Sequence, residues 1–470
     1  METLGKKLRM HWKRYGNCFK TKTRHASEQA YQYLRGQLTM ERDRNFAGIA
    51  RQVKGADGQA MQHFMSNSPW SAQSVYQQIQ AEIAGTPELG KGGIVIIDET
   101  AEEKAGGQSV GSSRQRNGRY GTIDECQVSV LMAYGNWKAS LWPIWTLVDA
   151  ELFLPAEWFD EEHAERRQKQ GVPVERKFET KAQLGLQMIR RAQQCGLPFE
   201  LVVCDDAYGR DHSFRSQLDQ EGLIYAADVP CSTQVYLQKP EIGLPPKVRR
   251  PPIHPRVLNG VPAIRVDQWA QDPSLSWQTL SIRSNERGVL EDRFAACRVW
   301  TWVFGSGDEP RPEWLIVRIE SNGDHIYVLS NALENTPLQQ LAEACCSRYF
   351  VERMIQDAKQ EFGWGDFQAQ KYLAWQHHTA LTACASWFVA QTKLSWAAKH
   401  LRDPQLIQQF ELQVLPALST ANVREMLRAV LPLHQLSPDE ARSQVVKHLV
   451  NRSRSTSSRL RHRRNATTQT

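Results

Sequence analysis

The sequence lacks the long hydrophobic runs, paired cysteines and hydrolase motifs that mark several classes of protein. No stretch of its 470 residues reaches the 18 or more uncharged apolar residues of a membrane helix, so we expect no membrane partner. Its nine cysteines form no CxxC pair, and neither HExxH nor GxSxG occurs. Zinc-protease and nucleophile-elbow chemistry are therefore not indicated.

A secretion signal is also missing. The N-terminal segment METLGKKLRMHWKRYGNCFK is basic, but no apolar core followed by small residues comes after the charges. With an odd number of cysteines and no such signal, we expect reduced thiols in a cytoplasm. The apolar content of 41% and the charged content of 23% are those of a globular protein.

Acidic residues are absent from one end of the chain and scarce at the other. Residues 442–470 hold eight Arg or Lys and no Asp or Glu, and residues 1–54 carry a net charge of +9. Because the whole chain carries +7, the stretch from 55 to 441 is acidic, at −10. Basic ends on an acidic body suggest a polyanionic partner, nucleic acid first, although solvated ends would give the same pattern.

The hydrophobic pattern changes three times along the chain. Residues 1–85 have helical spacing, and buried strands then alternate with crossover helices up to about residue 229, the pattern of an α/β layer. Residues 230–330 read as short antiparallel strands, and the chain is helical again from Pro337. We predict a polar loop over 106–121, one long helix over 338–363, and a Ser/Arg-rich tail that stays disordered until it binds.

Two apolar runs end in an acid. GIVIIDET leads from Ile94–Ile97 into Asp98, and FELVVCDDAYG leads into Asp205, with Asp206 beside it. Such runs are typical of strands buried on both faces. Sites in parallel sheets form at the carboxyl ends of strands, so Asp98 and Asp205 meet if the two strands are neighbours. Taken alone, each acid also fits a helix cap or a turn.

A third acid lies on the helix expected from RYFVERMIQDAK. At about 100° per residue, Arg348, Glu352 and Lys359 fall within about 40° of one another, and the apolar residues face elsewhere. Mg²⁺ and Mn²⁺ prefer carboxylate oxygens, and a third acid would complete a two-metal site for phosphodiester chemistry. An exposed helix with an ordinary Arg–Glu pair would show the same spacing.

Five segments in this order resemble the bacterial insertion-sequence DDE transposases: IIDET, SVGSSRQRNGRYGTIDECQVSVLMAYG, LFLPAEWF, VVCDDAYG and RYFVERMIQDAKQEFG. The resemblance covers about residues 30 to 395, and Arg348, Glu352 and Lys359 fit the Tyr-x-x-Arg-x3-Glu-x6-Lys signature of one branch. It implies an α/β fold with a ribonuclease-H-like core, in which Asp98, Asp205 and Glu352 are the catalytic metal ligands. One position departs, because Cys345 stands where the family has Tyr.

The resemblance gives each segment of the chain a role. The implied parts are a helical DNA-end-binding domain (1–85), the first part of the catalytic core (86–229), an all-β insertion (230–330), the second part of the core with the acidic helix (331–400), and C-terminal helices with a basic disordered tail (401–470).

It also implies the cofactor and the partners. We expect two Mg²⁺ or Mn²⁺ ions per site, double-stranded DNA as terminal inverted repeats and target, a homodimer in the synaptic complex, and a bacterial, nucleoid-associated cytoplasmic location. The expected DNA contacts are Arg348 and Lys359 beside the site, Arg114 and Arg116 in the polar loop, and Lys13 and Arg14 in the basic N-terminal segment.

The function that follows is metal-dependent cleavage of element ends and strand transfer into target DNA. Two alternatives remain open from the sequence. One is another ribonuclease-H-like nuclease, and the other is a domesticated or non-catalytic nucleic-acid-binding protein with the same core. The second would tolerate neutral substitutions at all three acids, which a nuclease would not.

Overall fold

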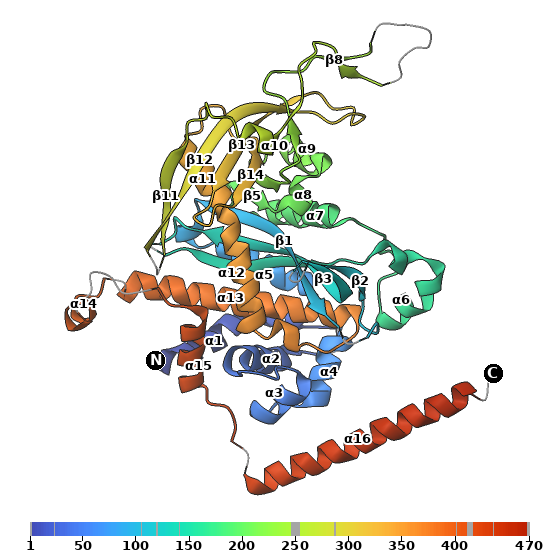
Figure 1. Ribbon diagram of the computed structural model, residues 1–470. Coiled ribbons are helices and arrows are strands. Elements are labelled where there is room, and N and C mark those ends of the chain that lie inside the picture. Colours follow the sequence, from blue (N-terminus) through green and yellow to red (C-terminus); the bar gives the residue numbers. More distant parts are fainter. Residues whose placement is uncertain are drawn as a thin grey trace.

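One large mixed sheet crosses the molecule, with helices packed on both of its faces (Figure 1). The computed structural model describes residues 2–22, 24–104, 106–118, 121–140, 142–245, 254–285, 288–400, 402–410, 417–435 and 437–467. The α/β class predicted from the sequence is confirmed.

Ten strands of the described chain form this sheet in the order β11-β12-β13-β14-β6-β5-β1-β3-β2, with β4 also paired to β3. Strand β5 is parallel to both β1 and β6, and β3 is antiparallel to β1 and β4. The strands are β1 (Gly93–Glu103), β2 (Ser113–Asn117), β3 (Thr122–Asn136), β4 (Ile144–Leu152), β5 (Leu201–Cys204), β6 (Tyr225–Val229), β11 (Gln278–Asn285), β12 (Gly288–Thr301), β13 (Arg311–Ile319) and β14 (His325–Ser330).

Helices α7 (Lys181–Gln194) and α12 (Tyr349–Gln360) lie on opposite faces of β1. A Cβ on Gly185 of α7 would lie 3.2 Å from Ile97, whereas a Cβ on Gly135 of β3 would lie 3.1 Å from Phe350 of α12 and 3.2 Å from Ile94. Side chains alternate along a strand, so Ile94, Ile96 and Asp98 share the α12 face, and Ile97 faces α7. The face on which Asp98 lies is therefore the face that α12 covers.

The N-terminal helices form a layer against α13 (Tyr372–His400), the long helix that also runs along β4 (Figure 1). Buried polar contacts tie the layer together: the Tyr33 hydroxyl meets His378 at 2.9 Å, and the Tyr76 hydroxyl donates to Thr379 at 2.9 Å. The layer shares one hydrophobic core with the sheet. Its helices are α1 (Glu2–Arg14), α2 (Ser27–Thr39), α3 (Phe46–Gln52), α4 (Gly58–Ser66) and α5 (Ala72–Ala84).

The remaining elements are shorter or lie outside these layers. The other helices are α6 (Ala164–Gln170), α8 (Asp206–Gly209), α9 (His212–Gln220), α10 (Val266–Trp269), α11 (Leu338–Cys345), α14 (Pro404–Phe410), α15 (Thr420–Val430) and α16 (Pro438–Thr467), with 3-10 turns at Gly16–Phe19, Pro87–Leu89, Ala156–Phe159, Glu161–His163, Cys346–Arg348 and Trp364–Asp366. Two small sheets pair β7 (Gln234–Val235) with β10 (Ile264–Arg265) and β8 (Ile242–Gly243) with β9 (Arg256–Val257).

Three local predictions were wrong. The segment expected as a polar loop contains β2, because Ser113–Asn117 extends the hairpin edge of β3; its residues 119–120 lie outside the described chain. The helix expected over 338–363 is broken by the 3-10 turn Cys346–Arg348, which separates α11 from α12. The tail expected to be disordered forms α16, where no Gly or Pro follows Pro438 to interrupt a helix.

Strands β11–β14 are hydrogen-bonded into the main sheet through β14 and β6, which pair antiparallel. A buried carboxylate, Glu313 of β13, fastens this junction: it accepts hydrogen bonds from Thr301 and Tyr225 and pairs with Arg215 of α9 and with Arg311. Burial alone would raise the pKa of Glu313, but Arg215 and Arg311 outweigh it and hold the pKa at about 2.

None of the helices described in the structure is both long enough and apolar enough to cross a membrane.

Replacing Glu313 by Gln should lower the free energy of unfolding by about 3–5 kcal/mol, because it leaves two buried guanidinium groups without their carboxylate. The difference from wild type should be present at neutral pH and shrink as pH falls from the ordinary value of 4.5 towards 2. Thermal melting at several pH values measures it. The control is Arg210→Ala, which breaks an exposed pair with Asp206 and should change little; an equal loss in both variants would contradict the proposed anchor.

Candidate active site

Three aspartates follow one row of paired residues across the parallel strands. Ile97 of β1 pairs with Cys204 of β5, and Cys204 pairs with Ala227 of β6. The next residue on each strand is an acid, and residues in one row of a parallel sheet point to the same face. These acids are Asp98, Asp205 and Asp228.

Negative charge is concentrated at this edge and is costly there. Burial raises the pKa of Asp98 to about 7, and the neighbouring Asp205 carboxylate adds to the rise. Burial also raises the pKa of Asp228 to about 7 against the opposing effect of Arg348, and burial and Glu99 raise the pKa of Asp205. Buried like charges at short range favour protonation or a bound cation.

The Arg348 guanidinium brings positive charge to these acids. Arg348 reaches Asp228 from Nε at 3.1 Å, Glu352 from Nη2 at 3.0 Å and Asp98 from Nη1 at 3.9 Å. Although burial lowers the pKa of Arg348, Asp228, Glu352 and Asp98 outweigh it and raise the pKa above its ordinary value. Arg348 therefore links the acids of the strands to the acid of the helix.

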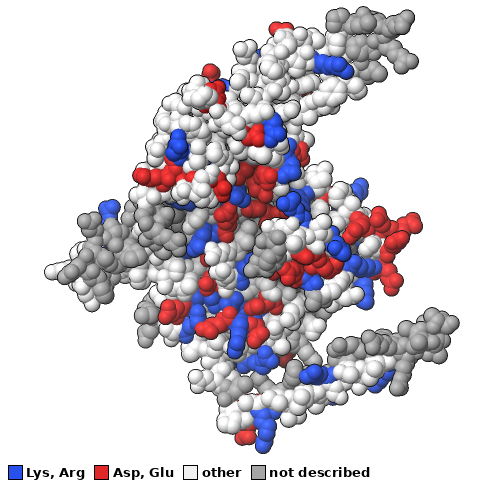
Figure 2. Space-filling view, in the orientation of Figure 1, with Lys and Arg blue, Asp and Glu red and all other residues white. Residues whose placement is uncertain are grey.

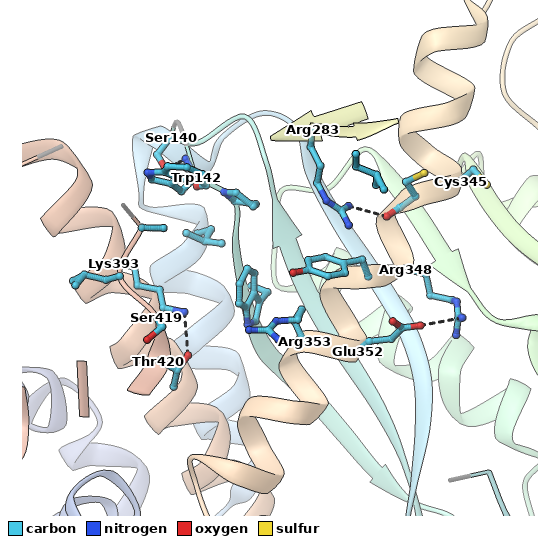
Figure 3. Close-up of a pocket in the computed structure, with 18 of the residues that line it drawn as sticks. Ser140, Trp142, Arg283, Cys345, Arg348, Glu352, Arg353, Lys393, Ser419 and Thr420 are labelled. Carbon is cyan, nitrogen blue, oxygen red and sulfur yellow. Dashed lines mark hydrogen bonds and ion pairs between the residues drawn. The ribbon is translucent and has the colours of Figure 1, made fainter. Parts of the chain in front are cut away.

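Glu352 lies on the first turn of α12 and is the most solvent-accessible of the acids, with 51% of its side chain exposed. The apolar face of the helix fixes its position, because Phe350, Val351 and Met354 are buried against the sheet. In Figure 3, Glu352 points toward Arg348 along the helix. The i,i+4 Arg–Glu pair that the alternative interpretation of this helix expected is thus present.

Lys359 lies in the last turn of α12, on the same stripe as Arg348 and Glu352, and pairs with a different carboxylate. Its Nζ pairs with Glu102 at 2.8 Å and donates to the Ala101 carbonyl at 3.1 Å. The sequence predicted that Lys359 lies beside the site acids. In the structure its amine instead pairs with Glu102, which lies four residues beyond Asp98 on β1.

The chemistry of the donor set fits a hard divalent cation. Asp98, Asp205 and Glu352 offer carboxylate oxygens, which Mg²⁺ and Mn²⁺ prefer. Within the described ranges, no three His, Cys, Asp or Glu side chains stand close enough together to hold a metal ion. Glu352 is bound to Arg348 here, so a closed cage requires Glu352 to turn from the guanidinium.

Asp228 is the site residue that the sequence interpretation missed. The segment LIYAADV shows the signal that identified the other two acids, an apolar run entering Asp, but Val229 continues the strand after it. In the sequence the apolar run therefore does not stop at this acid, whereas Glu99 follows Asp98 and Asp206 follows Asp205. The prediction that the first strand ends at Asp98 was itself wrong, because β1 continues to Glu103. Asp205, by contrast, both ends its strand and caps α8, accepting from the Ala207 amide at 3.1 Å.

The other predicted DNA contacts are not brought to this edge. Arg114 and Arg116 are exposed on β2. Lys13 is exposed on α1, and Arg14 is engaged within the protein, with Nε 2.7 Å from Glu82. On the face shown in Figure 2, acidic and basic side chains are interspersed.

A pocket of about 720 Å³ opens beside Glu352 and is lined on its far side by cations and aromatic rings (Figure 3). Arg353 stacks over Trp145, with its guanidinium carbon 5.9 Å from the ring centre, and Arg283 lies 4.0 Å over Tyr349. Cys345, at the position of the family Tyr, is buried with 4% exposed, and both Cys345 and Tyr349 line the pocket.

Two comparisons with known proteins bear on the family of this chain. Residues 14–289 match the family described as DDE superfamily endonuclease. The chain belongs to this family. A probable transposase for insertion sequence element IS701 from Microchaete diplosiphon is 25% identical over 349 residues, which are 74% of this chain and 78% of that protein. The family match of this DDE superfamily member includes the three strand acids, and Arg348 and Glu352 lie beyond its last residue.

We expect Lys359→Met and Glu102→Gln in this DDE superfamily member each to lower the melting temperature, and the double variant to lower it less than the sum. The amine and the carboxylate are largely shielded, with 23% and 18% exposed, so their coupling should be about 0.5–1 kcal/mol. Thermal melting of the four proteins measures it. Additive losses would show that the pair does not hold α12 on β1.

Proposed function

We propose that this protein is the transposase of an insertion sequence, which cleaves DNA at the ends of its element and joins those ends to target DNA. The observation that carries the proposal is the convergence of three acids from one row of parallel strands with the Arg348–Glu352 pair of α12. Membership of the DDE superfamily endonucleases and the likeness to a probable IS701 transposase support the same reading.

The strand order supports a ribonuclease-H-like core. Reading β4-β3-β1-β5-β6 across the sheet, only β3 runs against the others. Asp205 directly follows β5, and Asp98 and Asp228 lie beside it within β1 and β6. We assign β7–β14 to an insertion between β6 and α11, after which the chain returns with α12. The domain boundaries predicted from the sequence remain part of this proposal.

In the proposed mechanism Asp98, Asp205 and Glu352 hold two Mg²⁺ or Mn²⁺ ions. Bound there, the ions supply Lewis-acid activation for in-line attack on a phosphodiester. The protein's own part is to fix the geometry: the sheet register places Asp98 and Asp205, and packing of α12 on β3 keeps Glu352 on the same face of the sheet. Glu352 completes the ligand set when it turns from Arg348. Arg348 neutralises phosphate charge beside the scissile bond once Glu352 has turned away.

Double-stranded DNA is the proposed partner. The cations and rings of the pocket beside Glu352, among them Arg283, Arg353 and Trp145, suit phosphates and bases next to the site. We assign recognition of the terminal repeats to residues 1–85 and non-specific affinity to α16, an Arg-rich helix that runs apart from the body of the molecule (Figure 1). Figure 2 shows the same view as a surface. Joining two ends in one complex implies a homodimer on DNA.

Asp98→Asn, Asp205→Asn and Glu352→Gln should each reduce Mg²⁺-dependent cleavage at least about a thousandfold, because loss of one ligand removes several kcal/mol of charge stabilisation from the transition state. Binding of the same DNA should change little. The substrate is a labelled fragment carrying the sequence that flanks the reading frame, followed in single turnover.

Asp206→Asn is the matched control, because Asp206 is adjacent in sequence but pairs with Arg210 at 2.8 Å instead of facing the other acids. It should keep most of the activity. Near-normal cleavage by any of the three site variants would refute the triad. A wild-type protein that binds the flanking DNA but never cuts it would favour the non-catalytic alternative.

Deletion of residues 442–470 should weaken binding to every DNA duplex by a similar factor and flatten the dependence of log Kd on log salt, since each lost phosphate contact removes about 0.9 from the slope. The melting temperature should hold, because the described side chains of α16 beyond Pro438 are almost all exposed. Fluorescence anisotropy at several salt concentrations measures both quantities. Loss of discrimination between flanking and random DNA would reverse the assigned roles.

A further inference from the structure

We propose that Asp228 is a positioning residue that anchors Arg348, so that the guanidinium can release the metal ligands without leaving the site. The inference rests on the proposed function, because it concerns how the same acids exchange an internal cation for metal ions. It assigns a role to a fourth carboxylate that the triad of Asp98, Asp205 and Glu352 does not use.

The first argument is the distribution of contacts around one planar group. Each nitrogen of the Arg348 guanidinium meets a different carboxylate: Nε meets Asp228 at 3.1 Å, Nη2 meets Glu352 at 3.0 Å, and Nη1 meets Asp98 at 3.9 Å. The contact to Asp98 is too long for a hydrogen bond. Because Nε is the nitrogen nearest the side-chain stem, an anchor there leaves both outer nitrogens free to change partners.

The second argument is burial. Only 14% of the Asp228 side chain is exposed, against 51% for Glu352. A carboxylate with half of its surface in water loses little when it gives up a cation, whereas a buried one left unpaired is strongly destabilised. When the site changes state, Glu352 is therefore the partner that separates from Arg348, and Asp228 is the partner that stays.

The third argument is the rigidity of the backbone that carries Asp228. Strand β6 is hydrogen-bonded on both sides, to β5 and to β14, where Asp228 pairs with Val328. Helix α8 presses against the same residue, since a Cβ on Gly209 would lie 1.9 Å from the Asp228 carbonyl oxygen. Asp228 cannot follow Arg348 if the arginine moves, which suits a fixed pivot.

These features separate two roles for the guanidinium. Without metal, Arg348 balances the charge of the acid edge; with metal, its outer nitrogens turn to substrate phosphate while Nε stays on Asp228. Without the anchor, the whole positive charge of Arg348 would fall on the ligands Asp98 and Glu352 and compete with the metal. Loss of Asp228 should therefore weaken metal binding through Arg348, and not by removing a ligand.

The test is a titration of the full-length protein with Mn²⁺ alone, in which electron paramagnetic resonance measures the concentration of the free ion at each step. Asp228→Asn, which keeps the shape of the side chain, should raise the Kd for Mn²⁺ about tenfold, and Arg348→Gln should lower it. In the Arg348→Gln background, Asp228→Asn should shift the Kd less than about threefold. A tenfold weakening in both backgrounds would make Asp228 a ligand and overturn the proposal, as would no weakening in the wild-type background.

Two further measurements keep this result distinct from failure of the proposed function. Asp98→Asn should abolish tight Mn²⁺ binding; if it does not, the ion binds elsewhere and the proposed metal site fails. Thermal melting in the presence of a chelator then tests whether Asp228 anchors Arg348. Asp228→Asn should lower the melting temperature when Arg348 is present and should not lower it in Arg348→Gln, where Asp228 already lacks its partner. Equal losses in both backgrounds would overturn the anchor.

Discussion

Mutual repulsion of carboxylates at one edge of the sheet is the constraint on which the rest of this site depends. The register that pairs Ile97 with Cys204 and Cys204 with Ala227 leaves the protein no choice about where the next three side chains go. Burial and the neighbouring carboxylate raise the pKa of Asp98 and of Asp228. At neutral pH a nearby cation is therefore needed to stabilise the ionised acids. Arg348, at the start of α12, is that cation, so α12 must be held in a fixed position on the sheet.

Two ion pairs and one close approach hold that helix. Arg348 faces Asp98 and Lys359 faces Glu102, so α12 runs along β1 in the same direction as the strand. Eleven residues of helix cover about 16 Å and four residues of strand about 13 Å, which makes the two pairs compatible. Gly135 permits the approach, because any larger residue there would meet Phe350. The position of Glu352 follows from these contacts.

Local patterns in the sequence predicted most of the strands and helices of this core, but not which side chains pair across them. The buried runs before Asp98 and Asp205 are visible in the sequence because strands covered on both faces are continuously apolar. Asp228 escaped because the apolar residue Val229 follows it directly, so the apolar run does not visibly stop at the acid as it does at Asp98 and Asp205. The partner of Lys359, Glu102, lies on a strand about 250 residues earlier. The spacing of residues within a helix does not show which strand the helix will face. The β2 edge and α16 were missed for a related reason, since polar composition alone does not exclude a strand or a helix.

The choice of an arginine as the internal cation follows from the number of acids around it. A lysine ammonium is a compact charge that suits one or two carboxylates, whereas the planar guanidinium of Arg348 presents separate nitrogens to Asp228, Glu352 and Asp98. That arrangement lets one contact persist while the others are exchanged. An apolar edge would fold at lower electrostatic cost, so the buried acids are a cost to stability that only a function at this edge explains. The same charges that destabilise this edge are those that would attract a divalent ion, and Arg348 offsets part of their repulsion.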